Sequence, residues 1–153
     1  MRPNVIPEWD RNNVLPPIFP GEKGYSEKRS PYKADLLLFV ETFATSQKRI
    51  EILSGLLDYR SAFHQLNVMK GFQWLDGSFM DNVEITEERP PNDIDVVTFL
   101  HIPNNEAQKE FFANHRHLFI PEETKKRFFC RCLSICTWTA INALGCEMDF
   151  LLV

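Results

Sequence analysis

Residues 74–97 read WLDGSFMDNVEITEERPPNDIDVV and place two carboxylates, Asp93 and Asp95, at the start of an otherwise apolar strand. Side chains alternate along a strand, so Asp93 and Asp95 share one face while Ile94 and Val96 share the other. Two like charges at the edge of a sheet repel each other and lose solvation unless a cation lies between them. Carboxylate oxygens are the ligands that Mg²⁺ prefers. This stretch therefore predicts a magnesium site.

A Gly-Ser turn precedes this strand and supplies a second half for such a site. Fourteen residues separate Ser78 from Asp93. Glycine lets the backbone approach a phosphate closely, and a helix that begins directly after the turn would present free N–H groups to that phosphate. We therefore expect a phosphate site at Gly77 and Ser78 and a brief acidic helix over residues 79–87.

Simpler interpretations of these and other candidates stay open. Asp93 could belong to a turn, with Asp95 accepting hydrogen bonds from nearby backbone. Trp74 could stack on a nucleobase, although a tryptophan on a strand is more often part of the core. The basic cluster ETKKRFF is expected to be a solvated helix face. Structural or surface roles are expected for the histidines that could be mistaken for metal ligands: His101, His115 and His117.

The pattern along the chain predicts an α+β domain, a small mixed sheet covered by helices. Residues 1–31 hold most of the ten prolines, and we expect an extended arm there, because proline removes backbone donors and fixes φ. Residues 32–153 would form a single domain. Its expected elements are a helix from Ser30-Pro31, a helix from Ser46 to about Leu66, a strand at 71–77, the short helix, a strand at 93–102, helices from Asn104 or Asn105 and from Pro121, and a final strand.

The second helix is expected to bury one apolar face. Apolar residues recur along it at helical spacing and should point into the core: Ile50, Leu53, Leu57 and Phe63. Charged residues fall between them and should face water: Lys48, Arg49, Glu51 and Asp58.

Composition excludes several classes of protein. The 153 residues carry a formal net charge of −4, which argues against broad nucleic-acid binding. No apolar run reaches the roughly 20 residues of a membrane-spanning helix, and the N-terminus lacks the apolar segment of a secretion signal, so we expect a cytoplasmic protein with no membrane contact. The cysteine spacings do not fit zinc. We expect ordinary reduced thiols at all four positions: Cys130, Cys132, Cys136 and Cys146.

The order of these motifs carries a resemblance to a known family. Gly-Ser, a spacer and Asp-apolar-Asp resemble the signature of the DNA polymerase β-type nucleotidyltransferase superfamily, with a spacer slightly longer than usual. Over about residues 5–130 the chain is similar to a poorly characterised bacterial nucleotidyltransferase-like family, in stretches such as VLPPIFPG, GFQWLDGSF and PNDIDVVTF. The resemblance implies a nucleotidyltransferase-like fold. It also implies that Asp93 and Asp95 are catalytic and bind Mg²⁺, and that Gly77 and Ser78 hold the phosphates of a nucleoside triphosphate.

The resemblance also implies a third carboxylate on a later strand, and here the chain departs from the family pattern. The expected position follows PEETKKRFF and is near Arg131, and residues 132–146 carry no charge. The abrupt change after Cys130 makes the domain atypical or truncated beyond that point, and a change of reading frame would explain it. An arginine there could pair with Asp93 or Asp95 and replace the charge of a metal ion.

Two functions are therefore predicted. The first is a Mg²⁺-dependent nucleotidyltransferase that moves a nucleotidyl group from a nucleoside triphosphate to a hydroxyl of an unknown acceptor, which could be a protein, an RNA or a small molecule. The second is a catalytically inactive relative that acts as a binding or regulatory partner of another protein, such as the antitoxin half of a two-protein module.

Overall fold

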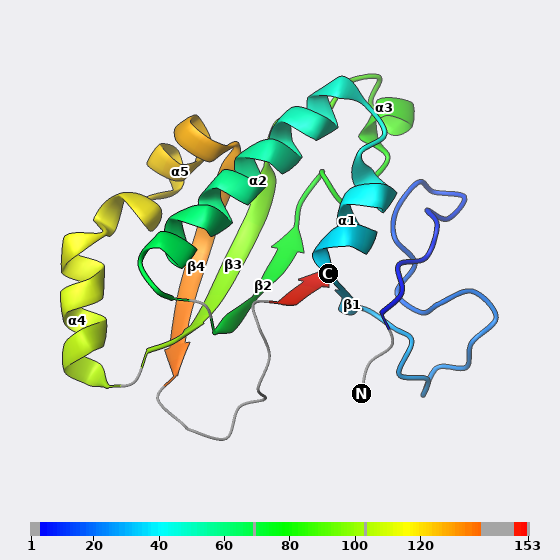
Figure 1. The fold of residues 1–153 in the computed structure, drawn as a ribbon. Helices are drawn as coiled ribbons and strands as arrows, with labels where there is room; N and C mark the ends of the chain where they lie inside the picture. Colours follow the sequence, from blue (N-terminus) through cyan, green and yellow to red (C-terminus); the bar gives the residue numbers. More distant parts are fainter. Residues whose placement is uncertain (1–3, 69, 103, 139–148, 153) are drawn as a thin grey trace.

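The protein folds into a mixed α+β domain in the computed structural model, which describes residues 4–68, 70–102, 104–138 and 149–152 (Figure 1). A five-stranded mixed sheet has the order β1-β5-β2-β3-β4. Helices α1, α2 and α5 lie on one face of the sheet, while α4 stands at its side (Figure 1). The expected α+β class is confirmed. The elements are β1 Tyr32–Ala34, α1 Leu36–Phe43, α2 Gln47–Gln65, β2 Gly71–Asp76, α3 Val83–Thr86, β3 Ile94–His101, α4 Asn105–Asn114, a 3-10 turn Arg116–Leu118, α5 Pro121–Phe128, β4 Cys130–Trp138 and β5 Asp149–Leu152.

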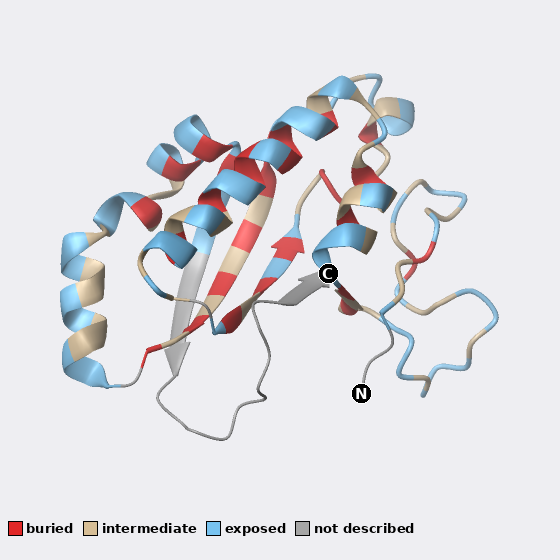
Figure 2. Cartoon of the chain, viewed as in Figure 1, coloured by how far each residue is buried: buried red, intermediate tan, exposed pale blue. Residues whose placement is uncertain are grey.

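Strand β3 lies between β2 and β4 and has one buried face. It pairs antiparallel with β2 and parallel with β4. Every second residue of β3 is buried, starting at Ile94 and ending at Leu100, and the intervening residues are half-buried (Figure 2). The predicted alternation is confirmed. The helix layer covers the buried face, so the side chains of Asp95, Val97 and Phe99 lie on the opposite face.

Helix α2 buries a different face from the one predicted. Leu53 and Phe63 are buried as expected, but Ile50 and Leu57 are 47% and 40% exposed. Arg49 was expected in water and is fully buried. The buried stripe is Arg49, Ile52, Leu53, Gly55, Leu56, Tyr59 and Phe63. The prediction was wrong because it treated Arg49 as a surface charge, whereas this side chain has partners on another element.

Three predicted helix starts are confirmed and one is wrong. Ser46 and Asn104 cap α2 and α4 through their side-chain oxygens, and Pro121 opens α5. Ser30-Pro31 leads into β1 instead of a helix. The first helix begins after Asp35, whose carboxylate accepts the N–H of Leu38 at 2.9 Å. The physical reason is that Tyr32–Ala34 pairs with β5, which the local sequence does not reveal.

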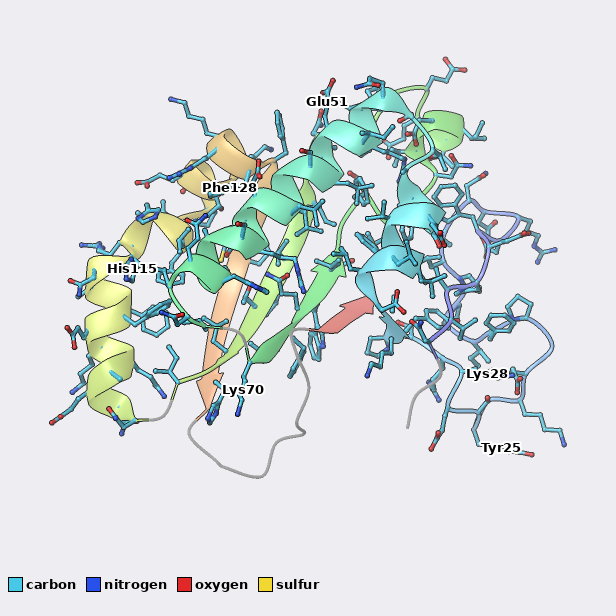
Figure 3. All side chains as sticks on the ribbon, viewed as in Figure 1. Tyr25, Lys28, Glu51, Lys70, His115 and Phe128 are labelled. Atoms are coloured by element: carbon cyan, nitrogen blue, oxygen red, sulfur yellow. The ribbon has the colours of Figure 1, made fainter. Side chains whose placement is uncertain are left out.

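The layers are joined by close aromatic packing. Phe128 of α5, labelled in Figure 3, has its ring 5.5 Å from that of Tyr59 on α2.

The N-terminal segment, residues 4–31, runs beside α1 and makes two isolated bridges, Asn4 with Lys33 and Ile18 with Arg29 (Figure 1). None of the described helices has the length and apolarity that crossing a membrane requires.

Candidate functional site

The two predicted carboxylates converge on one cationic side chain. Asp93 immediately precedes β3, and Asp95 is the second residue of that strand. Arg131 Nε lies 3.3 Å from Asp93 Oδ2 and 3.0 Å from Asp95 Oδ1. The sequence therefore placed the two acids correctly side by side. The cation between them is an arginine of the same chain.

The register of the sheet explains why Arg131 reaches both acids. Strands β3 and β4 are parallel, and Asp95 is the direct neighbour of Arg131. Lys125, in the last turns of α5, adds a second cation, with its Nζ 3.0 Å from Asp93 Oδ2. This contact was missed, because nothing in ETKKRFF indicates which lysine faces Asp93. Both cations are about half exposed, at 44% for Arg131 and 47% for Lys125.

The environment of Asp95 opposes its negative charge. Its Oδ1 is buried and accepts no hydrogen bond from the described residues, so the contact with Arg131 is purely electrostatic. Burial raises the pKa of Asp95, and the carboxylates of Asp93 and Asp76 raise it further, while the Arg131 guanidinium partly opposes the rise. A carboxylate in this state needs a nearby positive charge, because desolvation disfavours the ionised form.

The Gly-Ser turn lies directly against Asp95. Gly77 has φ +86°, in the left-handed region that favours glycine. A Cβ atom built on Gly77 would lie 2.6 Å from Asp95 Oδ2. The bend and the acid pair therefore lie side by side, as the spacing predicted, and a residue with a Cβ atom at position 77 would clash with Asp95.

We expect Gly77→Ala to lower the free energy of unfolding by about 1–3 kcal/mol more than Gly21→Ala does. Gly21 is a matched control, because its φ is +83° but a Cβ there would meet nothing within 4 Å. Both substitutions strain the backbone equally, so the difference isolates the clash with Asp95. Urea denaturation measures it. Equal losses for the two variants would show that Asp95 does not press against the bend.

The helix predicted after the turn is largely absent. Residues 78–82 form successive turns, and α3 covers only Val83–Thr86. The predicted span of 79–87 was therefore too long, and among the described residues no helix begins directly after Gly77 and Ser78. The physical reason is a set of tertiary contacts: side chains from other parts of the chain donate hydrogen bonds to the backbone carbonyls of this segment.

Arg49 is the main side chain that holds the segment after the turn. Its Nη1 donates to Phe79 O at 2.7 Å and its Nη2 to Asp81 O at 2.6 Å. Its Nε and Nη2 also donate to the two oxygens of Glu84, at 2.7 and 2.9 Å. Trp9 of the N-terminal segment donates its Nε1–H to Met80 O at 2.6 Å. The carbonyls of three consecutive residues, 79 to 81, thus accept hydrogen bonds from Arg49 or Trp9, which hold the segment after the turn in place.

The Arg49–Glu84 pair should make stability depend on pH. Hydrogen bonds from Arg49 hold the pKa of Glu84 below its ordinary value. A depressed carboxyl pKa stabilises the fold above the unfolded pKa of about 4.3, and the contribution disappears as the pH falls through the folded pKa. We therefore expect wild type to lose stability more steeply than Glu84→Gln between about pH 5 and 3. Glu51→Gln, an exposed change on α2, is the control. Parallel pH curves for wild type and Glu84→Gln would contradict this assignment.

The structure also places Trp74 and two of the cysteines that the sequence analysis considered. Trp74 is 37% exposed on the face of the sheet away from the helices, so its expected core position is wrong. Cys130 and Cys132 are buried free thiols as expected, and burial raises the pKa of Cys130. The predictions for Cys136 and Cys146 lie outside the described side chains. Among the described residues, no cluster of three or more histidine, cysteine or acidic side chains is arranged to hold a metal ion.

Asp76 is a site residue that the sequence analysis overlooked. It is the last residue of β2 and pairs in register with Asp95, and its Oδ1 accepts the N–H of Gly77 at 2.7 Å. The signal was available in the sequence, because Asp76 directly precedes Gly77 and lies two residues after Trp74, on the same face of the strand.

The family can now be assigned. The sequence pattern of the family described as "Family of unknown function (DUF6932)" matches residues 7–143. The chain belongs to this family. The DUF6932 match takes in Gly77, Asp93, Asp95 and Arg131, so the complete site lies within the matched region. Comparison with curated proteins and with solved structures gave no match.

Proposed function

We propose that this chain is a catalytically inactive nucleotidyltransferase-like protein that acts as a binding or regulatory partner of another protein. One observation carries the proposal. Arg131 Nε occupies the point on which Asp93 and Asp95 converge, at 3.3 and 3.0 Å. The nucleotidyltransferase type of the fold rests on the resemblance in the sequence and is supported by the contact of Gly77 with Asp95.

The donor set around this point fits a guanidinium better than a divalent ion. Arginine stays charged at every physiological pH, so Arg131 always places one positive charge between the two carboxylates, and Lys125 supplies a second beside Asp93. A divalent ion on the same oxygens would lie beside the guanidinium, and a charge of +2 and a charge of +1 that lie 4 Å apart near a protein surface repel by about 8 kcal/mol, twice the value for two unit charges. Lys125 adds to that repulsion from the side of Asp93. The third acidic ligand that the resemblance implies is replaced by Arg131 itself.

A second candidate function is the Mg²⁺-dependent transfer of a nucleotidyl group from a nucleoside triphosphate to a hydroxyl acceptor. The exposure of Arg131 and Lys125 favours it, because half-exposed side chains can move away from the acids without unpacking the core. In this case Asp93 and Asp95 would hold the metal, and Gly77 and Ser78 would hold the phosphates.

Thermal unfolding with and without ligand separates the two functions. On the first proposal, millimolar Mg²⁺ with each nucleoside triphosphate leaves the Tm unchanged. A ligand at 100 times its Kd stabilises a fold by about 2.7 kcal/mol, which raises the Tm of a domain this size by about 5–10 °C. A rise of that kind that Asp95→Asn abolishes would overturn the proposal in favour of the enzyme. Incubation with labelled triphosphates and cell lysate would then identify the acceptor.

A further inference from the structure

The face of the sheet opposite the helices carries an aromatic cluster. Phe72 and Phe99 are register neighbours on β2 and β3, and their rings stack with centroids 4.3 Å apart. The ring of Trp74 lies 5.0 Å from that of Phe99. Leu133 of β4 is 49% exposed, and the bulge in the β3–β4 register falls beside it. Within the described part of the chain, the helices cover only the other face.

An acidic residue without a cationic partner lies beside this cluster. Asp76 is exposed and lies two residues from Trp74, on the same side of β2. None of the ion pairs of the described residues involves Asp76, whereas the nearby cations Lys125 and Arg131 are already paired with Asp93. The carboxylate of Asp76 also lies near that of Asp81: burial and Asp76 raise the pKa of Asp81, while Arg49 lowers it.

We propose that this face docks a partner protein, one of whose arginine or lysine side chains stacks on Trp74 and pairs with Asp76. Apolar side chains that flank the cation in the partner would lie on Phe72, Phe99 and Leu133. This inference rests on the proposed function, since it specifies the partner of a protein that acts by binding.

The chemistry of the face favours a cationic occupant. A cation over an indole gains about 0.5–2 kcal/mol, and an adjacent carboxylate adds a charged hydrogen bond. Exposed tryptophan is also among the side chains that contribute most to protein interfaces. A single-stranded nucleic acid would use aromatic rings as well, but it requires a positively charged groove for its phosphates. The cations described at this edge, Lys125 and Arg131, are already paired with carboxylates, and the carboxylate of Asp76, which is in none of the described ion pairs, would repel those phosphates.

Synthetic peptides and NMR test the proposal on the full chain. The probes are acetyl-Leu-Arg-Leu-Arg-Leu-Arg-amide, its counterpart with glutamate in place of arginine, and AMP. Binding is followed through the indole N–H signal of Trp74, which Trp74→Phe assigns. We expect only the basic peptide to shift this signal to saturation. Asp76→Asn should weaken its affinity about tenfold. Trp74→Leu lacks the indole, so its binding is followed through the backbone amide signal of Asp76, and we expect a loss of affinity by a similar factor.

The controls separate this surface from general attraction to an acidic protein. Asp58→Asn removes one exposed charge from α2 on the helix side, and we expect it to change the affinity less than about twofold. Asparagine at position 76 keeps the oxygen that accepts the Gly77 N–H, so Asp76→Asn should fold, and its remaining indole signals report this. Equal effects of Asp76→Asn and Asp58→Asn, no shift with the basic peptide, or equal binding of AMP or the acidic peptide would each overturn the proposal. Such a failure leaves the occupancy of the acid pair by Arg131 untouched, because the Mg²⁺ experiments test that separately.

Discussion

Arg49→Met is expected to lower the free energy of unfolding by about 3–5 kcal/mol. The Arg49 side chain is fully buried and makes hydrogen bonds to Glu84, Phe79 O and Asp81 O. Methionine fills a similar volume but leaves the carbonyls of Phe79 and Asp81 without a donor and the Glu84 carboxylate without its cation, with only the 3.4 Å hydrogen bond from Ser46 Oγ. A buried polar group that has lost its hydrogen-bond partner costs the full free energy of its desolvation, because no protein contact replaces the water it gave up.

Urea denaturation measures this loss against a matched neighbour. Lys48→Met removes a cation next to Arg49 in the sequence, but Lys48 is partly exposed and pairs with the exposed Glu51, so we expect a loss below about 1 kcal/mol. Combining Arg49→Met with Glu84→Gln should recover part of the loss, because no carboxylate then remains without its partner. If Arg49→Met and Lys48→Met cost the same, Arg49 does not hold the segment after the Gly-Ser turn.

Arg131→Asp is expected to create divalent-ion binding. It replaces the guanidinium with a third carboxylate at the register position of Asp95, beside Asp93. Three carboxylates at one edge repel each other and supply the oxygen ligands that Mg²⁺ and Mn²⁺ prefer. We therefore expect the affinity for Mn²⁺ to rise by at least about tenfold, which corresponds to about 1.4 kcal/mol. Titration calorimetry measures it.

Arg131→Gln is the matched control for that gain. It removes the same positive charge without adding a carboxylate, so its affinity for Mn²⁺ should fall between those of wild type and Arg131→Asp. The variant with three acids should also be less stable than Arg131→Gln in the absence of metal. If wild type binds Mn²⁺ as tightly as Arg131→Asp, Arg131 does not exclude the ion and the second candidate function gains support.

Features set by local periodicity and capping could be predicted from the sequence. The alternation of β3 placed Ile94 in the core and Asp95 on the other face, and the caps at Ser46 and Asn104 fixed two helix starts. The Gly77 bend and the acid pair were also expected together, because a strand, a tight turn and a returning strand bring them to one edge.

Features set by distant partners could not be predicted. Arg49 can be buried because it pairs with Glu84. The two residues are 35 positions apart in the chain, so no local pattern reveals the pairing. Tyr32–Ala34 forms a strand because of β5, near the other end of the chain. Lys125 reaches Asp93 because α5 ends directly before β4, whose first residue, Cys130, pairs with Ile94 next to Asp93. In each case a tertiary contact decided what the local sequence left open.

The central claim is that Arg131 is the permanent cation of the acid pair. The most direct measurement is a Mg²⁺ titration of the wild-type protein, followed through the carboxylate ¹³C signals of Asp93 and Asp95. We predict that both signals stay unchanged up to millimolar Mg²⁺, while the Arg131 Nε–H signal keeps its position. Saturating shifts of both carboxylate signals, with a simultaneous shift of Arg131, would show that the ion displaces the guanidinium and would contradict the claim.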